Sequence, residues 1–236
     1  MMEKMINTMM KHYQLFAWMG LIIVLIALWF AFSVGASANA TFFSVDKATR
    51  EAARTSTIYA LANVARNSIP TWVPMLKFLG LGIMLGAITM ALGSIAQTLR
   101  VLGKEVTAKW PTELHPGEPE KPKAARMFPV LMMMGWMILI IGLILGLWLT
   151  GTVSSYWNNS IANELNPAKT GSVLLSQLGL ITSTLPWLNA LRFLGMAFLF
   201  TAITVALTVI IRTLQFQESA LDKFLQAARS NKTASV

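Results

Sequence analysis

Residues 76–99 read LKFLGLGIMLGAITMALGSIAQTL, and residues 191–214 read LRFLGMAFLFTAITVALTVIIRTL. The second stretch lies 115 positions after the first, and the two match at 12 of their 24 positions without a gap. Gly20 and Gly135 are also 115 positions apart, in the apolar segments that precede these stretches. The sequence therefore predicts an internal duplication in which each copy contains two apolar segments.

The composition is that of a membrane protein. Hydrophobic residues make up 55% of the chain, charged residues only 12%, and the mean hydropathy is +0.59. Four apolar runs have the length needed to cross a bilayer and carry no charged residue in their middle, roughly at 15–36, 78–99, 128–150 and 193–214. We therefore predict an all-α integral membrane protein with four transmembrane helices.

The first apolar run resembles a secretory signal peptide because lysines precede it and Ala36-Ser37-Ala38 resembles a cleavage site. Its length of about 20 residues exceeds the roughly 7–15 residues of a signal-peptide core. Gly20 also gives it a counterpart in the third run, so we expect a transmembrane helix here.

The distribution of lysine and arginine predicts the orientation. The N-terminal segment, the middle loop and the C-terminal end hold two, six and four of these residues, whereas the other two loops hold five together. Cytoplasmic loops carry the excess of positive charge, so we expect both termini and the middle loop in the cytoplasm, with the protein in the plasma (inner) membrane. The net charge of +9 then reflects topology, and we expect lipid rather than nucleic acid as its counterpart.

A repeat of two spans ends on the side where it began, so the two copies are expected to be parallel, related by an axis along the membrane normal. The domains follow from this division. Residues 1–110 form the first transmembrane hairpin, 111–126 a proline-rich cytoplasmic linker, and 127–236 the second hairpin. The second hairpin ends in an amphipathic segment at 215–230.

Both outer loops contain helix-forming sequence. Residues 46–67 and 171–184 are rich in helix formers, and each stretch is followed by a proline, Pro70 in the first and Pro186 in the second. We therefore predict a short extracytoplasmic helix that ends before the second span and another that ends before the fourth.

Aromatic and cationic residues recur near the outer ends of these spans. Trp72 aligns with Trp187, and Lys77 aligns with Arg192. We expect the tryptophans to be interfacial anchors. The two cations either extend to the headgroups or form a paired site for an anion or a lipid headgroup.

Small residues within the spans predict close helix packing. Gly82 and Gly86 in the second span, and Gly142 and Gly146 in the third, have the small-xxx-small spacing that lets two helix backbones approach. The fourth span has Ala197 and Thr201 where the second has Gly82 and Gly86. This divergence favours a partner protein at the glycine face of the second span.

The polar groups within the spans include a repeat-related pair, Thr89 and Thr204. These threonines either line a narrow polar path, or bond across two helices, or bond back to their own helices. The spans contain no carboxylate in their middle, which disfavours transport coupled to protons or sodium.

The sequence offers no chemistry that predicts an enzyme or a cofactor. His12 and His115 are the only histidines, and neither lies where it would face a bundle interior, so we expect no haem. Cysteine is absent, and the run 132–134 of three methionines points in different directions on a helix, so we expect no metal site. No serine nucleophile with partners and no phosphate-binding loop is present.

We therefore expect a non-enzymatic accessory or structural subunit. It would pack against other integral membrane subunits, or against copies of itself, through its glycine faces and outer helices. The alternative is an oligomeric channel or uncoupled small-molecule transporter lined by Thr89 and Thr204.

Overall fold

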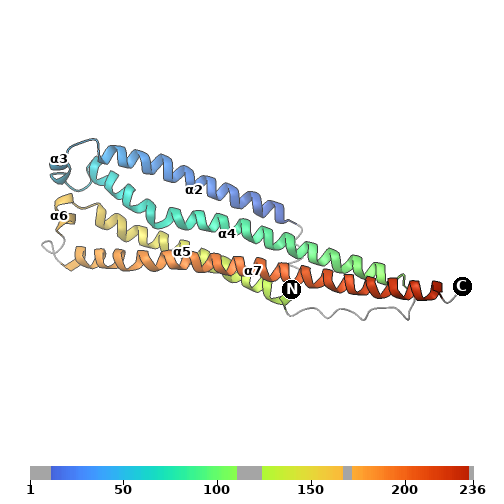
Figure 1. Ribbon diagram of the computed structural model, residues 1–236. Helices are drawn as coiled ribbons and strands as arrows, with labels where there is room; N and C mark the ends of the chain where they lie inside the picture. Colours follow the sequence, from blue (N-terminus) through green and yellow to red (C-terminus); the bar gives the residue numbers. More distant parts are fainter. Residues whose placement is uncertain (1–11, 111–123, 167–171, 234–236) are drawn as a thin grey trace. The chain divides into compact units, whose positions relative to one another are not determined.

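The computed structural model describes residues 12–110, 124–166 and 172–233. These residues form six α-helices and no strand: α2 Tyr13–Phe42, α3 Lys47–Glu51, α4 Ile58–Thr107, α5 Ala124–Trp157, α6 Ile161–Leu165 and α7 Ser172–Thr233 (Figure 1). Four of them, α2, α4, α5 and α7, are long and apolar enough to cross a membrane. The prediction of an all-helical protein with four such helices is confirmed. His115 and most of the predicted linker lie outside the described residues.

The prolines do not end the helices, and this part of the prediction was wrong. Pro70 and Pro74 lie inside α4, and Pro186 lies inside α7, so the expected outer helices are continuous with the spans. A proline removes a single backbone donor, and a helix tolerates this where packing holds the chain on both sides. Ser68, before Pro70, and Val73, after it, are both buried in this way.

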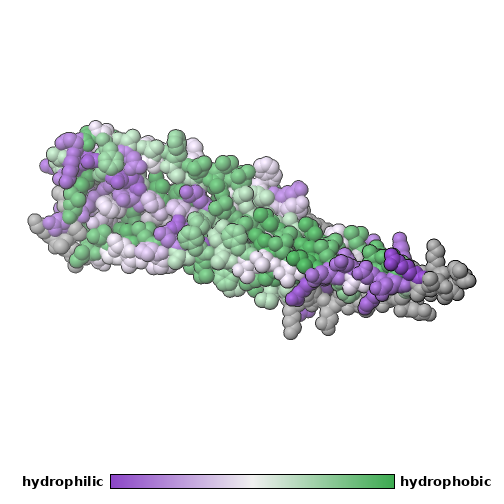
Figure 2. All heavy atoms as spheres, viewed as in Figure 1, coloured by the Kyte–Doolittle hydropathy of each residue, from purple (hydrophilic) through white to green (hydrophobic). Residues whose placement is uncertain are grey.

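The described chain divides into two compact units. The larger unit comprises residues 17–84 and 134–197, and the smaller unit comprises the remaining described residues, in 12–16, 85–133 and 198–233. In the larger unit the four long helices run alongside one another, and α3 and α6 lie side by side at one end (Figure 1). Figure 2 shows hydrophilic residues gathered at that end and mainly hydrophobic residues along the middle of α2.

The core of the larger unit joins α4, α5 and α7. Its buried members are Met75, Leu149, Val153, Tyr156, Ile181 and Leu188. Hydroxyl groups add a polar seam between α4 and α5. Thr71 Oγ1 lies 2.8 Å from Thr150 Oγ1, and Ser68 Oγ lies 3.5 Å from Ser154 Oγ. In a region shielded from water such side-chain pairs satisfy each other and fix the register of the two helices.

Glycines allow close approaches between helices. A Cβ atom on Gly20 of α2 would lie 2.6 Å from the backbone oxygen of Gly80 in α4. A Cβ atom on Gly195 of α7 would lie 2.8 Å from Leu139 Cγ and 3.2 Å from the backbone oxygen of Gly135 in α5. Each of the helix pairs α2–α4 and α5–α7 therefore meets at a pair of glycines.

Two phenylalanines join α4 to α7 in the same unit. The ring centroids of Phe78 and Phe193 are 5.6 Å apart, at an interplanar angle of 77°. The guanidinium carbon of Arg192 lies 5.4 Å from the centroid of the Phe78 ring. The edge-to-face geometry of the two phenylalanine rings is one of the favourable arrangements for an aromatic pair.

In the smaller unit the C-terminal part of α7 packs on the last turns of α4. Gln217 Nε2 donates a hydrogen bond of 2.7 Å to the backbone oxygen of Leu99. The rings of Trp110 and Phe224 stack with centroids 4.7 Å apart. The amphipathic segment predicted at 215–230 therefore uses part of its apolar face within the chain, while Leu221 and Leu225 remain exposed.

Candidate functional site

The glycines predicted to mediate packing are all buried. The backbone oxygen of Gly82 accepts a hydrogen bond of 2.8 Å from the indole nitrogen of Trp136. A Cβ atom on Gly146 would lie 2.8 Å from the backbone oxygen of Thr71, and one on Gly142 would lie 3.2 Å from Met75. Gly82, Gly142 and Gly146 thus lie between α4 and α5 of the same chain, and Gly82 is not on a free surface. Gly86 is buried in the smaller unit.

The two threonines differ in their surroundings. Thr89 is fully buried and its hydroxyl donates to the backbone oxygen of Leu85 at 3.0 Å. Thr204 is exposed and its hydroxyl donates to the backbone oxygen of Phe200 at 3.0 Å. Both hydroxyls therefore bond back to their own helices, which is one of the alternatives that the sequence leaves open.

The aligned tryptophans and cations lie in the larger unit. Trp72 is half-buried against Phe30, with ring centroids 5.4 Å apart, whereas Trp187 is exposed. Lys77 is partly exposed. The Nε atom of Arg192 is buried and has no hydrogen-bond partner in the part of the chain that the structure describes.

The residues considered for metal or haem chemistry do not gather. His12 is exposed, and of the methionine run Met132 is buried while Met133 and Met134 are exposed. Among the described residues no group of three or more histidine, aspartate or glutamate side chains could hold a metal ion.

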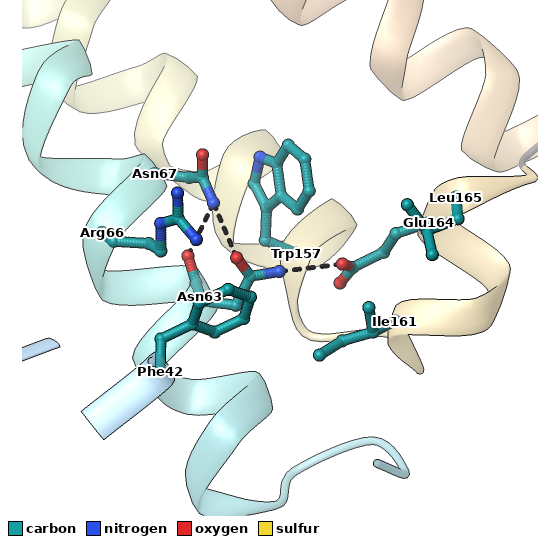
Figure 3. A pocket seen from close by; sticks show the side chains of 8 residues that line it. All are labelled: Phe42, Asn63, Arg66, Asn67, Trp157, Ile161, Glu164 and Leu165. Carbon is teal, nitrogen blue, oxygen red and sulfur yellow. Dashed lines mark hydrogen bonds between the residues drawn. The ribbon is translucent and has the colours of Figure 1, made fainter. Parts of the chain in front are cut away.

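The residues that do converge form a cavity at the end of the larger unit that holds α3 and α6. It has a volume of about 210 Å³ (Figure 3). Side chains from α2, α4, α5 and α6 line it, namely Phe42, Asn63, Arg66, Asn67, Trp157, Ile161, Glu164 and Leu165. We call it the Glu164 cavity.

A chain of hydrogen bonds holds the polar side of the cavity. Asn67 Nδ2 donates to the backbone oxygen of Asn63 at 2.8 Å and to its Oδ1 at 3.0 Å. Asn63 Nδ2 in turn donates to Glu164 Oε2 at 2.8 Å. The hydroxyl of Tyr156 donates to the backbone oxygen of Glu164 at 3.1 Å. Asn63 and Glu164, which are only 3% and 6% exposed, are therefore fixed by groups on α4 and α5.

One of the two carboxyl oxygens of Glu164 has a hydrogen-bond partner among the described residues, and the other has none. The Oε1 atom is buried and has no partner among the described residues, while Oε2 has Asn63. Burial disfavours the charged form and raises the pKa of Glu164 to about 8, which the hydrogen bond from Asn63 opposes. A carboxyl group of this kind can exchange its proton for a cation or hydrogen-bond donor that enters the cavity.

Two arginines lie against Phe42 and Phe43, and one of them, Arg66, lines the same cavity as Glu164. The guanidinium carbon of Arg66 is 4.5 Å from the centroid of Phe42 and 4.9 Å from that of Phe43. Arg50 lies 4.9 Å from each of the same two rings. Neither arginine has a carboxylate within ion-pair distance in the described parts of the chain. Both arginines therefore make cation–π contacts with the same two phenylalanine rings, Phe42 and Phe43.

Sequence reasoning missed this cavity. Glu164 is the one acidic residue between the third and fourth apolar runs, and Asn63 and Asn67 are amides one helical turn apart. Those signals were visible, but nothing in the sequence indicates that positions 63 and 164 meet.

No known protein family, curated protein or solved structure matches this chain.

Proposed function

We propose that this protein is an integral membrane accessory subunit that binds a transmembrane helix of another protein through α2. The observation that carries the proposal is the exposure of α2. In its most apolar stretch only 11% of the residues are buried, against 39% for α4. Among the exposed large side chains of α2, five repeat at intervals of four and three residues, and we call them the α2 stripe: Trp18, Ile22, Leu25, Trp29 and Phe32.

The geometry of the α2 stripe supports a protein partner in addition to lipid. Intervals of four and three are those at which the knobs of one helix enter the holes of another. Phe32 is 75% exposed and Trp18 64%, so rings project from the stripe. A partner helix with glycine, alanine or serine on one face would accept these rings, because small residues let helices approach within a membrane.

The internal duplication is part of the proposal. The paired glycines support it, since Gly20 and Gly80 in the first copy correspond to Gly135 and Gly195 in the second at the offset of 115. Phe78 corresponds to Phe193 at the same offset, and these two rings are in contact with each other. Contact between equivalent residues is expected next to a two-fold axis that relates parallel copies.

The proposed membrane position rests on aromatic and basic residues. Trp29, Trp148 and Trp187 are exposed, and tryptophans prefer the membrane interface. Along the chain, between 22 and 28 residues separate Trp148, Trp187 and Trp72 from Arg126, Arg212 and Arg100 respectively. This is close to the span of a hydrocarbon core. We place the basic ends and both termini in the cytoplasm and α3 and α6 outside the plasma membrane.

Photochemical cross-linking tests the partner. Ile22 or Leu25 is replaced by p-benzoylphenylalanine, and exposed Ile140 of α5 serves as the control position. The proposal expects one adduct with a different membrane protein from Ile22 and Leu25 and none from Ile140, together with co-purification at a fixed ratio in mild detergent. Adducts with lipid alone, or only with a second copy of this chain, contradict it.

The rival function is an oligomeric channel or uncoupled transporter. Thr89 is buried and Thr204 exposed, so a path lined by Thr204 would form only where several copies meet. Solute flux into liposomes that is lost in the double variant Thr89→Val with Thr204→Val would favour the rival. Liposomes that remain tight to ions and neutral solutes would count against it.

A further inference from the structure

We propose that the Glu164 cavity binds a small zwitterion, with the ligand's ammonium group on the carboxyl group of Glu164 and its anionic group on Arg66. The inference goes beyond the accessory role, because the cavity lies at the α3–α6 end and the α2 stripe does not line it.

The cationic half of the ligand is specified by Glu164. The residue is 6% exposed, lines the cavity, and has one carboxyl oxygen fixed by Asn63 and the other without a partner (Figure 3). Burying an oxygen of this kind without a hydrogen bond is costly, so a donor that reaches it gains both the bond and the charge interaction. An ammonium group supplies three donors and a positive charge.

The anionic half is specified by Arg66. Arg66 lines the same cavity, and its guanidinium carbon lies 4.5 Å from the ring centroid of Phe42 and 4.9 Å from that of Phe43. Since Arg66 has no carboxylate within ion-pair distance among the described residues, its N–H groups are available for an anion. Arg50 on the same rings adds a second positive charge to this side of the site.

The walls and the size limit the ligand. Phe42, Trp157, Ile161 and Leu165 form apolar walls around the charged groups. A volume of about 210 Å³ is below the range of sites for drug-sized ligands, which begins near 300 Å³. The ligand is therefore a small molecule, or the headgroup of a larger one, with an ammonium and an anionic group joined by a short linker.

Two sources supply this chemistry, a free zwitterion such as an amino acid and the headgroup of phosphatidylethanolamine. The probes are β-alanine and O-phosphoethanolamine as free zwitterions, with ethanolamine and inorganic phosphate as single-charge controls. Isothermal titration of the full-length protein in detergent is expected to show that at least one zwitterion binds and that both controls bind at least about tenfold more weakly. Nanodiscs of phosphatidylethanolamine compared with phosphatidylcholine then test the lipid source through retention of lipid on the purified protein.

Variants assign the binding to the cavity. Glu164→Gln keeps the shape and an acceptor for Asn63 but removes the charge, and Arg66→Gln removes the opposite charge. Each is expected to raise the Kd at least about tenfold, since one lost charged hydrogen bond of about 1.4 kcal/mol is worth that factor. Glu105→Gln, at an exposed carboxyl group in the smaller unit, is the matched control and is expected to bind as the unaltered chain does.

Two results of these experiments would overturn the proposal. Absence of binding for both zwitterions and for phosphatidylethanolamine overturns the proposal, as does binding that neither variant at Glu164 or Arg66 weakens. If Glu164→Gln unfolds, as judged by circular dichroism, Arg66→Gln carries the test, because Arg66 is less buried than Glu164.

Discussion

Gly20 and Gly80 lie against each other because neither carries a side chain. A Cβ atom on Gly20 would stand 2.6 Å from the backbone oxygen of Gly80, closer than any relaxation of a side chain can relieve. Helix pairs in membranes depend on such contacts, since lipid leaves little hydrophobic drive to bring helices together. A side chain at either glycine would therefore push α2 and α4 apart at this point.

Gly20→Ala is expected to lower the free energy of unfolding by about 1–3 kcal/mol, because the added methyl group forces α2 away from α4. Gly151→Ala in α5 is the matched control, since a Cβ atom there meets nothing within 4 Å. The control should be neutral or stabilising by about 0.5–1 kcal/mol, as glycine is a poor helix former. Thermal unfolding of both variants in one detergent measures the difference. Equal midpoints for the two variants would show that the glycine contact does not hold the helices.

The buried carboxyl group of Glu164 makes stability depend on pH. Its pKa is raised from an ordinary 4.5 to about 8, so between these values the folded state holds a proton that the unfolded state has released. Stability from this group is full below about pH 4.5, falls as pH rises, and is lost beyond about pH 8. Asn63 on α4 and Tyr156 on α5 contact Glu164, and Arg66 lines the same cavity.

Glu164→Gln is therefore expected to remove part of the loss of stability between about pH 5 and pH 9, on the order of 2–4 kcal/mol. Unfolding midpoints at the two pH values measure it, with Glu105→Gln as the control that keeps the full dependence. A Glu164→Gln profile parallel to that of the unaltered chain would mean that the carboxyl group titrates normally.

At the scale of single residues, the sequence predicts which positions correspond in the two copies, but it does not predict which distant residues are in contact. The glycines at 20 and 135 were found from their offset, and the structure uses both positions for helix contact. The pair Asn63–Glu164 joins positions 101 apart in the two halves of the chain, and no spacing rule links them. Its detection required the tertiary packing of α4 with α6.

At the scale of elements, α4 and α5 are joined by hydroxyl pairs as well as by apolar side chains. Thr71 and Thr150 approach to 2.8 Å, and Thr71 is 3% exposed. Hydrogen bonds across helices contribute about 0.6 kcal/mol on average and up to about 1.7 kcal/mol in a membrane protein. The pair is thus a measurable part of the α4–α5 contact.

A double-mutant cycle with Thr71→Val and Thr150→Val is expected to give a coupling energy of about 0.6–1.7 kcal/mol. Thr182→Val replaces an exposed hydroxyl that bonds only within α7, and its cycle with Thr150→Val should give no coupling. Unfolding in a denaturing detergent supplies the free energies. Additive effects of Thr71→Val and Thr150→Val would remove the hydroxyl pair from the account of this contact.

The four long helices were predictable because an apolar run of about 20 residues leaves the chain few alternatives. Their ends were not. The prolines at 70 and 186 predicted helix ends, but both lie inside continuous helices of 50 and 62 residues. Packing on both sides of a proline decides between a break and a tolerated gap, and the local sequence does not report that packing.

At the scale of the whole molecule, the proposed membrane position rests on one claim, that four helices cross the membrane with both termini on one side. Parallel hairpins would then put the Glu164 cavity on the other side. The charge distribution supports this topology, since the two termini and the middle loop hold most of the lysines and arginines. In an inverted arrangement the loops within the two hairpins would instead lie on opposite sides of the membrane.

Single-cysteine labelling tests this claim most directly, because the chain contains no cysteine of its own. Ala48→Cys in α3 and Glu218→Cys in the last part of α7 are both at exposed positions. A membrane-impermeant maleimide added to intact cells is predicted to label Ala48→Cys at once and Glu218→Cys only after the membrane is permeabilised. Labelling of both positions in intact cells, or of Glu218→Cys alone, would contradict the topology.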